Sequence, residues 1–210
     1  MTKCTRRAAL LAAPLLLAVG CSVNVPVEYS PLAAADTLVE PGEQPANVYV
    51  VSFKNELEDA EQIGSWKNSL GLEKKKIVTD SPIGRVFAEA CTDALNKAGL
   101  RASLHSDRKT GEAIPDSALR GYEAIVGGAV RTLHTVVRPR FSNADVISTV
   151  EMEVQVTKNG QTDVIGPIEG TARKSLPAVT WQDLSSVTNL AIQNAMRNMI
   201  RHLRASGALR

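Results

Sequence analysis

The chain has 210 residues, of which 44% are hydrophobic, 4% aromatic and 22% charged, with 24 basic against 22 acidic residues. This length allows one domain with a substantial core, and the near balance of charge excludes a strongly basic, nucleic-acid-binding composition. We therefore expect no nucleic-acid partner, and the few aromatic residues give no support to the stacking of bases or sugars.

The first 20 residues have the pattern of a bacterial lipoprotein signal. Three basic residues open the chain, and an uncharged apolar run of twelve residues follows over 8–19. This run is too short for a membrane span, which needs about 20 residues. Small residues stand directly before Cys21, in the sequence Ala-Val-Gly-Cys. We expect Cys21 to become the lipidated first residue of the mature chain, carrying palmitate; the alternative is an ordinary secretory signal with a chance cysteine.

The predicted signal carries three of the basic residues and no acidic ones, so the mature chain has 21 basic and 22 acidic residues and a formal charge of −1. Ser22 follows the cysteine. Among bacterial lipoproteins an aspartate at this position favours the inner membrane. Resemblance to that class therefore implies an outer-membrane anchor, with the domain facing the periplasm.

Residues 21–46 are interrupted by four prolines, at 26, 31, 41 and 45, which predicts a flexible tether. A flexible chain of about 25 residues spans roughly 25–30 Å. The alternative is that 23–29 adds a strand to the sheet. The predicted organisation is a signal peptide over 1–20, a lipidated N-terminus and tether over 21–46, and a single periplasmic domain over 47–210.

In the first half of that domain, a run rich in β-branched and aromatic residues predicts a buried strand, and apolar residues at helical spacing predict a helix ended by Gly99. Asp80 and Ser81 before Pro82 are typical of a helix start with a capping side chain. In chain order we expect a strand over 48–53, a loop or irregular hairpin over 54–71, a strand over 72–78, the helix, and a strand over 100–104.

The second half contains the clearest pattern, a strict alternation of apolar and polar residues over 146–157, which predicts a strand with one wet face. Asn159-Gly160 predicts a two-residue hairpin turn, and Thr180 with Asp183 predicts a capped final helix. A polar loop over 106–116 and strands over 122–137 and 161–174 complete the set. The predicted fold class is α+β, a mostly antiparallel sheet with two helices packed on one face.

No catalytic, metal or cofactor site is expected, and we predict that the protein is not an enzyme. Glu151 and Glu153 share a strand face, but an open polar face does not bury a carboxyl group and so does not raise its pKa. The histidines at 105, 134 and 202 lack metal-ligand spacing. Cys91 is the one thiol outside the leader and Cys21, and we interpret it as a buried hydrophobic side chain; pairing with another chain is the alternative.

Two groups of basic residues form a candidate patch for an anionic partner. One is a run of three lysines on the strand over 72–78, and the other surrounds the end of the strand over 122–137. The alternative is that these residues are solvated charges that protect a strand edge. The patch residues are Lys74, Lys75, Lys76, His134, Arg138 and Arg140.

Several motifs resemble the YajG-like bacterial lipoprotein family: Ile-Gly-Ser-Trp-Lys-Asn at 63–68, Pro-Ile-Gly-Arg-Val at 82–86 and Ala-Gly-Leu at 98–100. The resemblance covers most of 15–135. It implies an envelope location and an α+β body, and it implies no activity. The layout is also similar to LpoB-like and transporter-auxiliary periplasmic lipoproteins.

We expect a membrane-anchored, non-catalytic binding or assembly partner in the bacterial envelope, with an envelope protein or a second copy of the chain as its partner. The alternative function is binding of an anionic lipid or cell-wall ligand through the basic patch. A hydrolase would need a deep pocket at Glu151, Glu153 or His134.

Overall fold

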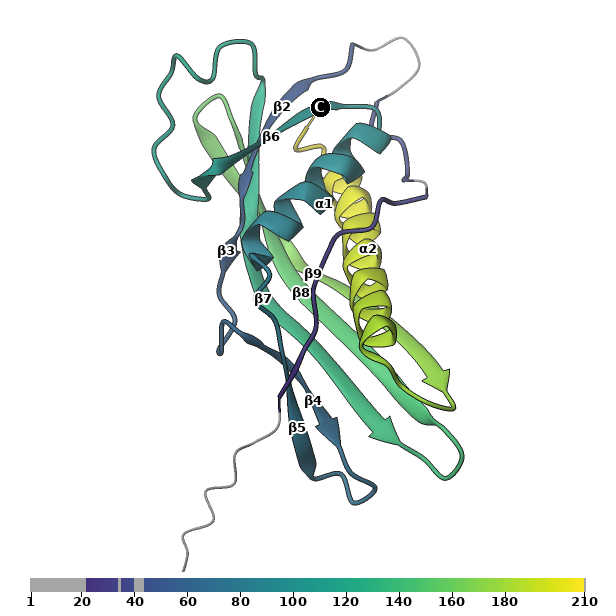
Figure 1. The fold of residues 1–210 in the computed structure, drawn as a ribbon. Helices are drawn as coiled ribbons and strands as arrows, with labels where there is room; N and C mark the ends of the chain where they lie inside the picture. The colour runs from purple at the N-terminus through teal and green to yellow at the C-terminus, as the bar shows by residue number, and fades with distance from the viewer. Residues whose placement is uncertain (1–21, 34, 40–43, 210) are drawn as a thin grey trace, which may run out of the picture.

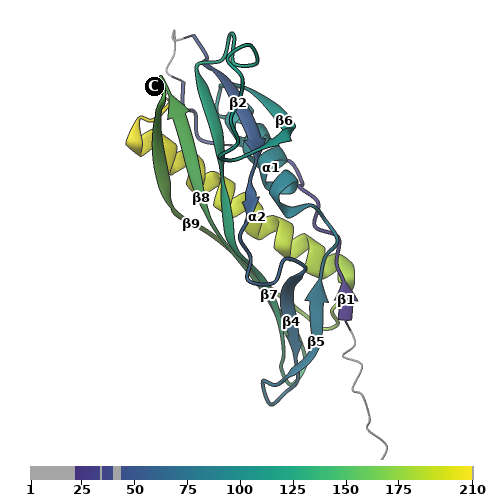
Figure 2. The same ribbon diagram turned by 90° about the vertical axis from the view of Figure 1, so that its left-hand side faces the viewer.

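Two helices lie against one face of a nine-stranded sheet in the computed structural model, which describes residues 22–33, 35–39 and 44–209 (Figures 1 and 2). This arrangement confirms the α+β class. The strands are β1 (Ser22–Asn24), β2 (Asn47–Ser52), β3 (Lys54–Asn55), β4 (Gln62–Lys67), β5 (Glu73–Val78), β6 (Arg101–Lys109), β7 (Ala124–Pro139), β8 (Ala144–Lys158) and β9 (Gln161–Leu176), and the helices are α1 (Ile83–Lys97) and α2 (Trp181–Ser206).

Strand β7 organises the sheet because both of its edges are paired along much of its length. One edge pairs with β8 in antiparallel fashion, and β8 pairs in turn with β9. The other edge pairs with three short strands in succession, β2, β3 and β4, all parallel to β7. The long antiparallel strands β8 and β9 thus lie on one side of β7, and the short parallel strands β2, β3 and β4 lie on the other.

The sheet is mixed, which corrects the prediction of a mostly antiparallel one. Besides the three parallel pairings of β7, β1 is parallel to β5 and β2 to β6. The reason lies in the connection between β2 and β6, in which β5 and α1 return the chain to the end where β2 starts. Strand β6 therefore begins beside the start of β2, where Arg101 pairs with Asn47, and the two strands run in the same direction.

Local signals in the second half of the domain are confirmed. Asn159 and Gly160 both have positive φ, as a two-residue hairpin turn requires. The Thr180 side chain accepts a hydrogen bond from the Asp183 backbone N–H, and the Asp183 carboxylate accepts one from the Thr180 backbone N–H, which completes the predicted capping box.

The predicted side-chain cap of α1 is wrong. Pro82 is the N-cap residue, and no side chain caps the helix. The Ser81 hydroxyl instead accepts a hydrogen bond from the backbone N–H of Val27, 54 residues away in the sequence. The Ser81 hydroxyl, which the local sequence predicts to cap α1, is therefore bound by a segment distant in the sequence.

The predicted loop or irregular hairpin over 54–71 contains β3 and β4, and β4 forms an irregular hairpin with β5. Gly64 allows β4 to approach β7, because a Cβ atom at this position would lie 1.9 Å from the Thr135 carbonyl oxygen. The hairpin alternative is therefore the correct one.

The core lies between the sheet and the two helices. Alternate residues of β8 from Val146 to Val156 face the helices and are buried, as the alternation predicts. The largest fully buried side chains include Phe87 and Leu95 of α1 and Met196 and Met199 of α2. The helices thus cover one face. On the other face the start of the β6–β7 loop covers part of the sheet, where Thr110 packs against Gly127 and Val51 is buried. In the described ranges, no helix is long and apolar enough to cross a membrane.

Candidate functional site

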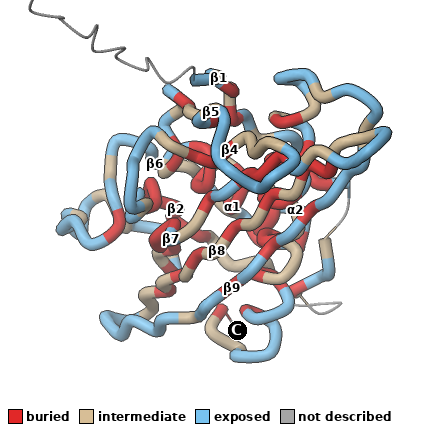
Figure 3. Tube along the Cα trace, turned by 90° about the horizontal axis from the view of Figure 1, so that it is seen from below, coloured by how far each residue is buried: buried red, intermediate tan, exposed pale blue. Residues whose placement is uncertain are grey.

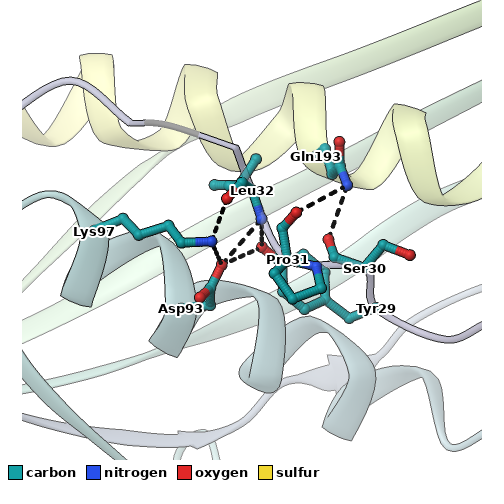
Figure 4. Close-up of polar contacts among 7 residues, drawn as sticks. All are labelled: Tyr29, Ser30, Pro31, Leu32, Asp93, Lys97 and Gln193. Carbon is teal, nitrogen blue, oxygen red and sulfur yellow. Dashed lines mark hydrogen bonds and ion pairs between the residues drawn. The ribbon is translucent and has the colours of Figure 1, made fainter.

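The segment after the predicted lipid anchor is bound between α1 and α2, which corrects the prediction of a flexible tether (Figure 4). Four of its side chains, Val25, Val27, Leu32 and Leu38, are buried in the core. Strand β1 pairs with β5, so the alternative of an added strand is realised over Ser22–Asn24. We call residues 22–33 and 35–39 the N-terminal segment. The signal peptide and Cys21 lie outside the described residues.

Polar contacts hold the N-terminal segment to both helices (Figure 4). The Tyr29 hydroxyl donates a 2.6 Å hydrogen bond to the Asp93 carboxylate of α1, and the backbone N–H of Leu32 donates to the same two side chains. Lys97 donates to the Leu32 carbonyl and forms a 3.0 Å ion pair with Asp93. From α2, the Gln193 amide donates to the Ser30 carbonyl at 2.8 Å.

These contacts place charged and neutral groups so that they stabilise each other. Burial alone would raise the pKa of Asp93, but hydrogen bonds from Tyr29 and Lys97 outweigh it and lower that pKa below its usual value. Burial and the hydrogen bond to Asp93 raise the pKa of Tyr29. At neutral pH the tyrosine is therefore the donor and the carboxylate the acceptor, which fixes the segment on α1.

Because the N-terminal segment is held in place, Ser22 has a defined position on the body. Ser22 pairs with Lys76 of β5, at the end of the molecule that carries the turn between β4 and β5 and the turn between β7 and β8 (Figure 1). We call this the turn end. Figure 3 looks onto it, with β1, β5 and β4 side by side. The first described residue after Cys21 therefore lies at the turn end.

The structure brings most of the predicted basic patch to the turn end. Lys74, Lys75 and Lys76 lie on β5, beside β4, which is itself paired with β7. Arg138 and Arg140 lie at the end of β7 and line an open depression of about 390 Å³. Lys67 also lines this depression, and sequence reasoning missed it because β4 was not recognised as a neighbour of β7.

One patch residue, Arg140, is paired with a buried carboxylate. Its guanidinium forms an ion pair with Asp145, which is only 2% exposed, and Arg173 forms a second ion pair with the same carboxylate at 2.7 Å. The Ser175 hydroxyl also donates to Asp145. The Ser175 hydrogen bond, supported by those from Arg140 and Arg173 and opposed by burial, lowers the pKa of Asp145 to about 2. Arg140 therefore has a structural role, because it neutralises the buried Asp145 carboxylate.

His134 lies apart from the other patch residues. It lines a different depression, shared with Arg131 and the acidic residues Glu58 and Asp59. Burial, reinforced by nearby Lys67, lowers the pKa of His134 below its usual value of 6.5. The lowered pKa favours the neutral ring, so His134 adds little positive charge to the patch.

No protein-family model matches this sequence, and no curated protein matches it. The YajG-like resemblance stays a prediction.

Several solved structures are similar in fold at low identity. A protein of the DUF330 family from Xanthomonas campestris is 9% identical over 89% of this chain and 98% of its own, with a TM-score of 0.49. The PelC dodecamer from Paraburkholderia phytofirmans is 13% identical over 75% and 92%, with a TM-score of 0.35. The lipoprotein GNA1162 from Neisseria meningitidis is 14% identical over 68% and 92%, with a TM-score of 0.29. These values carry no inference about function.

The other candidate residues occupy structural positions. Glu153 forms a 2.9 Å ion pair with Arg131, on the open face of the sheet. Cys91 is fully buried with its sulfur 3.8 Å from that of Met199, and burial raises the pKa of its thiol to about 12, which confirms the interpretation as a buried side chain. Within the ranges that the structure describes, no group of three or more potential metal ligands comes together.

A second surface feature lies at the opposite end of the molecule and was not predicted. The rings of Tyr49 and His105 stack at 3.7 Å, and Tyr122 meets both edge-on. Beside them, the loop between β6 and β7 covers an open hollow of about 350 Å³, lined in part by Thr110 and Ile125. Tyr49 lies on β2, His105 on β6 and Tyr122 in the loop before β7, so no local sequence pattern indicates that the three rings meet.

Proposed function

We propose that this protein is a lipid-anchored component of the bacterial envelope that works by binding a partner and not by catalysis. The observation that carries the anchoring in this proposal is the position of Ser22. The residue that follows a lipobox cysteine is built into the sheet, and the chain after it is packed between both helices. A lipid on Cys21 would therefore hold the whole body close to the bilayer at the turn end.

Anchoring is tested by replacing Cys21 with serine in the full chain. We expect the wild-type protein to incorporate labelled fatty acid and to fractionate with the outer membrane, as Ser22 implies. The variant should lose the label and leave the membrane fraction. Unchanged lipid labelling of Cys21→Ser would contradict the assignment.

We expect the partner, an envelope protein or a second copy of this chain, to contact the end opposite the anchor. That end would face the periplasm, and it carries the aromatic cluster and the hollow under the 110–122 loop. A photo-reactive amino acid at Ala113, an exposed position in this loop, should give a discrete adduct in cells. The same probe in the Cys21→Ser chain should give less. Absence of any adduct with an envelope protein or a second copy would count against this role.

A second candidate function is binding of a soluble anionic cell-wall ligand in the depression at the turn end. It is favoured by the three cationic side chains that line this depression, Lys67, Arg138 and Arg140. Binding of this kind should weaken with salt and fall when Arg138 and Arg140 are replaced by alanine. The same affinity after both replacements would remove this candidate.

A further inference from the structure

The most exposed large hydrophobic side chains of the described residues gather at the turn end. Phe141 is fully exposed in the turn between β7 and β8, and Leu70 (81%) and Leu72 (62%) are exposed in the turn between β4 and β5. The two turns are neighbours, because residues of both line the same depression. Three large apolar groups thus project into solvent from two adjacent hairpins, which is a costly arrangement unless something covers them.

Positive charge surrounds these apolar groups. Asp145 and Asp183, the acidic groups near the end of β9, are already in ion pairs with basic residues of the body. Glu73 is the exposed acidic residue of the β4–β5 hairpin. Five basic residues at this end have no ion pair with any described residue: Lys67, Lys74, Lys75, Lys76 and Arg138.

We propose that the turn end docks onto the surface of an anionic lipid bilayer, with Leu70, Leu72 and Phe141 inserted among the headgroups and the basic residues at the level of the phosphates. Apolar side chains ringed by lysine and arginine are the combination that binds such surfaces. Projecting hairpin tips fit a deformable bilayer without a preformed pocket. The identity of this bilayer as the one that holds the lipid on Cys21 rests on the proposed function.

The lipid on Cys21 and the side chains of the turn end would act on the same bilayer, because Ser22 lies at that end of the body. Ser22 enters the sheet beside Lys76, on the same hairpin that carries Leu70. An anchor at this point would bring both turns to the bilayer without stretching the chain. The body would then stand with its strands directed away from the membrane, and the aromatic cluster at the other end would be presented to the periplasm.

The test uses vesicle flotation of the mature chain, beginning at residue 21, with Cys21→Ser. This chain keeps every core residue, since the core extends from Val25 to Leu209. It should float with vesicles of phosphatidylethanolamine and phosphatidylglycerol, and much less with neutral phosphatidylcholine vesicles. Phe141→Ser should weaken binding roughly tenfold, and each of Lys74→Ala and Lys76→Ala about fivefold.

Matched controls come from the opposite end. Val164 is as exposed as Leu72, at 61%, but lies on β9 near the hairpin with β8. Val164→Ser, and Arg101→Ala with Arg120→Ala, should leave vesicle binding unchanged. Melting temperatures of all variants should match the parent, because every replaced side chain is exposed.

A fluorescent probe reports the orientation directly. Cysteine placed by Phe141→Cys or Val164→Cys can be labelled selectively, because Cys91 is fully buried. A polarity-sensitive dye should shift to shorter wavelength on anionic vesicles at position 141 and not at position 164. Equal shifts at both positions, equal binding to neutral vesicles, or no vesicle binding would each overturn the proposal. An adduct between position 141 and an envelope protein in cells, in place of lipid contact, would also overturn it.

The two proposals fail separately. Loss of vesicle binding with intact lipid labelling of Cys21 in cells would remove only the docking surface. Vesicle binding without lipid labelling would leave the docking surface and remove the anchor.

Discussion

Replacing Leu32 by alanine tests whether the N-terminal segment is part of the folded body. Leu32 is 2% exposed and packs in the core between the helices. The change removes three buried carbon groups, worth about 0.8 kcal/mol each in transfer free energy, or roughly 2.4 kcal/mol. Leucine-to-alanine changes in protein cores cost about 2–5 kcal/mol. Because the N-terminal segment is neither helix nor strand at Leu32, it can shift and partly close the cavity, and we expect a loss of about 2–3 kcal/mol.

The measurement is urea unfolding of the wild type and the variant, which should show a lower midpoint with an unchanged slope. For a domain of this size the melting temperature should fall by about 5–10 °C. Leu70→Ala is the matched control, because Leu70 is 81% exposed, and it should change stability by less than about 0.5 kcal/mol. If Leu32→Ala is as mild as the control, the segment is not bound and the position of Ser22 is undetermined.

Two further predictions concern the ends and the middle of the sheet. With the pKa of Asp145 lowered to about 2 from 3.8, its contribution to stability is full above about pH 4 and is lost as pH falls toward 2. Asp145→Asn should therefore lower the urea midpoint at pH 7 and flatten its fall in acid; an unchanged acid slope would contradict this. A Cβ atom at Gly170 would lie 2.2 Å from the Ala191 carbonyl oxygen of α2, so Gly170→Ala should cost about 1–3 kcal/mol by calorimetry. The exposed neighbour Thr171→Ala should cost little, and equal losses would refute the close approach of β9 to α2.

Sequence patterns predicted the elements well wherever a pattern is local. The alternation over 146–157, the Asn159-Gly160 turn and the capping box at Thr180 are all present. Each of these signals depends on residues a few positions apart, so no other part of the chain is needed to produce it. The candidate site was predicted in part, since the lysines of β5 and Arg138 do share one end of the molecule.

The sequence-based predictions that were wrong share a physical cause. The prolines at 26 and 31 favour an irregular segment, but they say nothing about where apolar neighbours such as Val25 and Val27 are buried. Ser81 has the side chain of a helix cap, yet it accepts its hydrogen bond from Val27. His134 shares strand parity with Arg138 but lies in another depression. In each case a contact between segments distant in sequence decided the outcome.

The sequence by itself determined the leader pattern ending at Cys21, the α+β class, the order of the main strands and helices, and the long hairpin of β8 and β9. These follow from spacing and turn chemistry within short windows. Only the tertiary structure decided that β7 pairs with three short parallel strands, that the N-terminal segment lies between α1 and α2, and that Leu70, Leu72 and Phe141 project from one end. The packing site of the segment between α1 and α2, and the end from which those side chains project, exist only once distant strands and both helices have packed together.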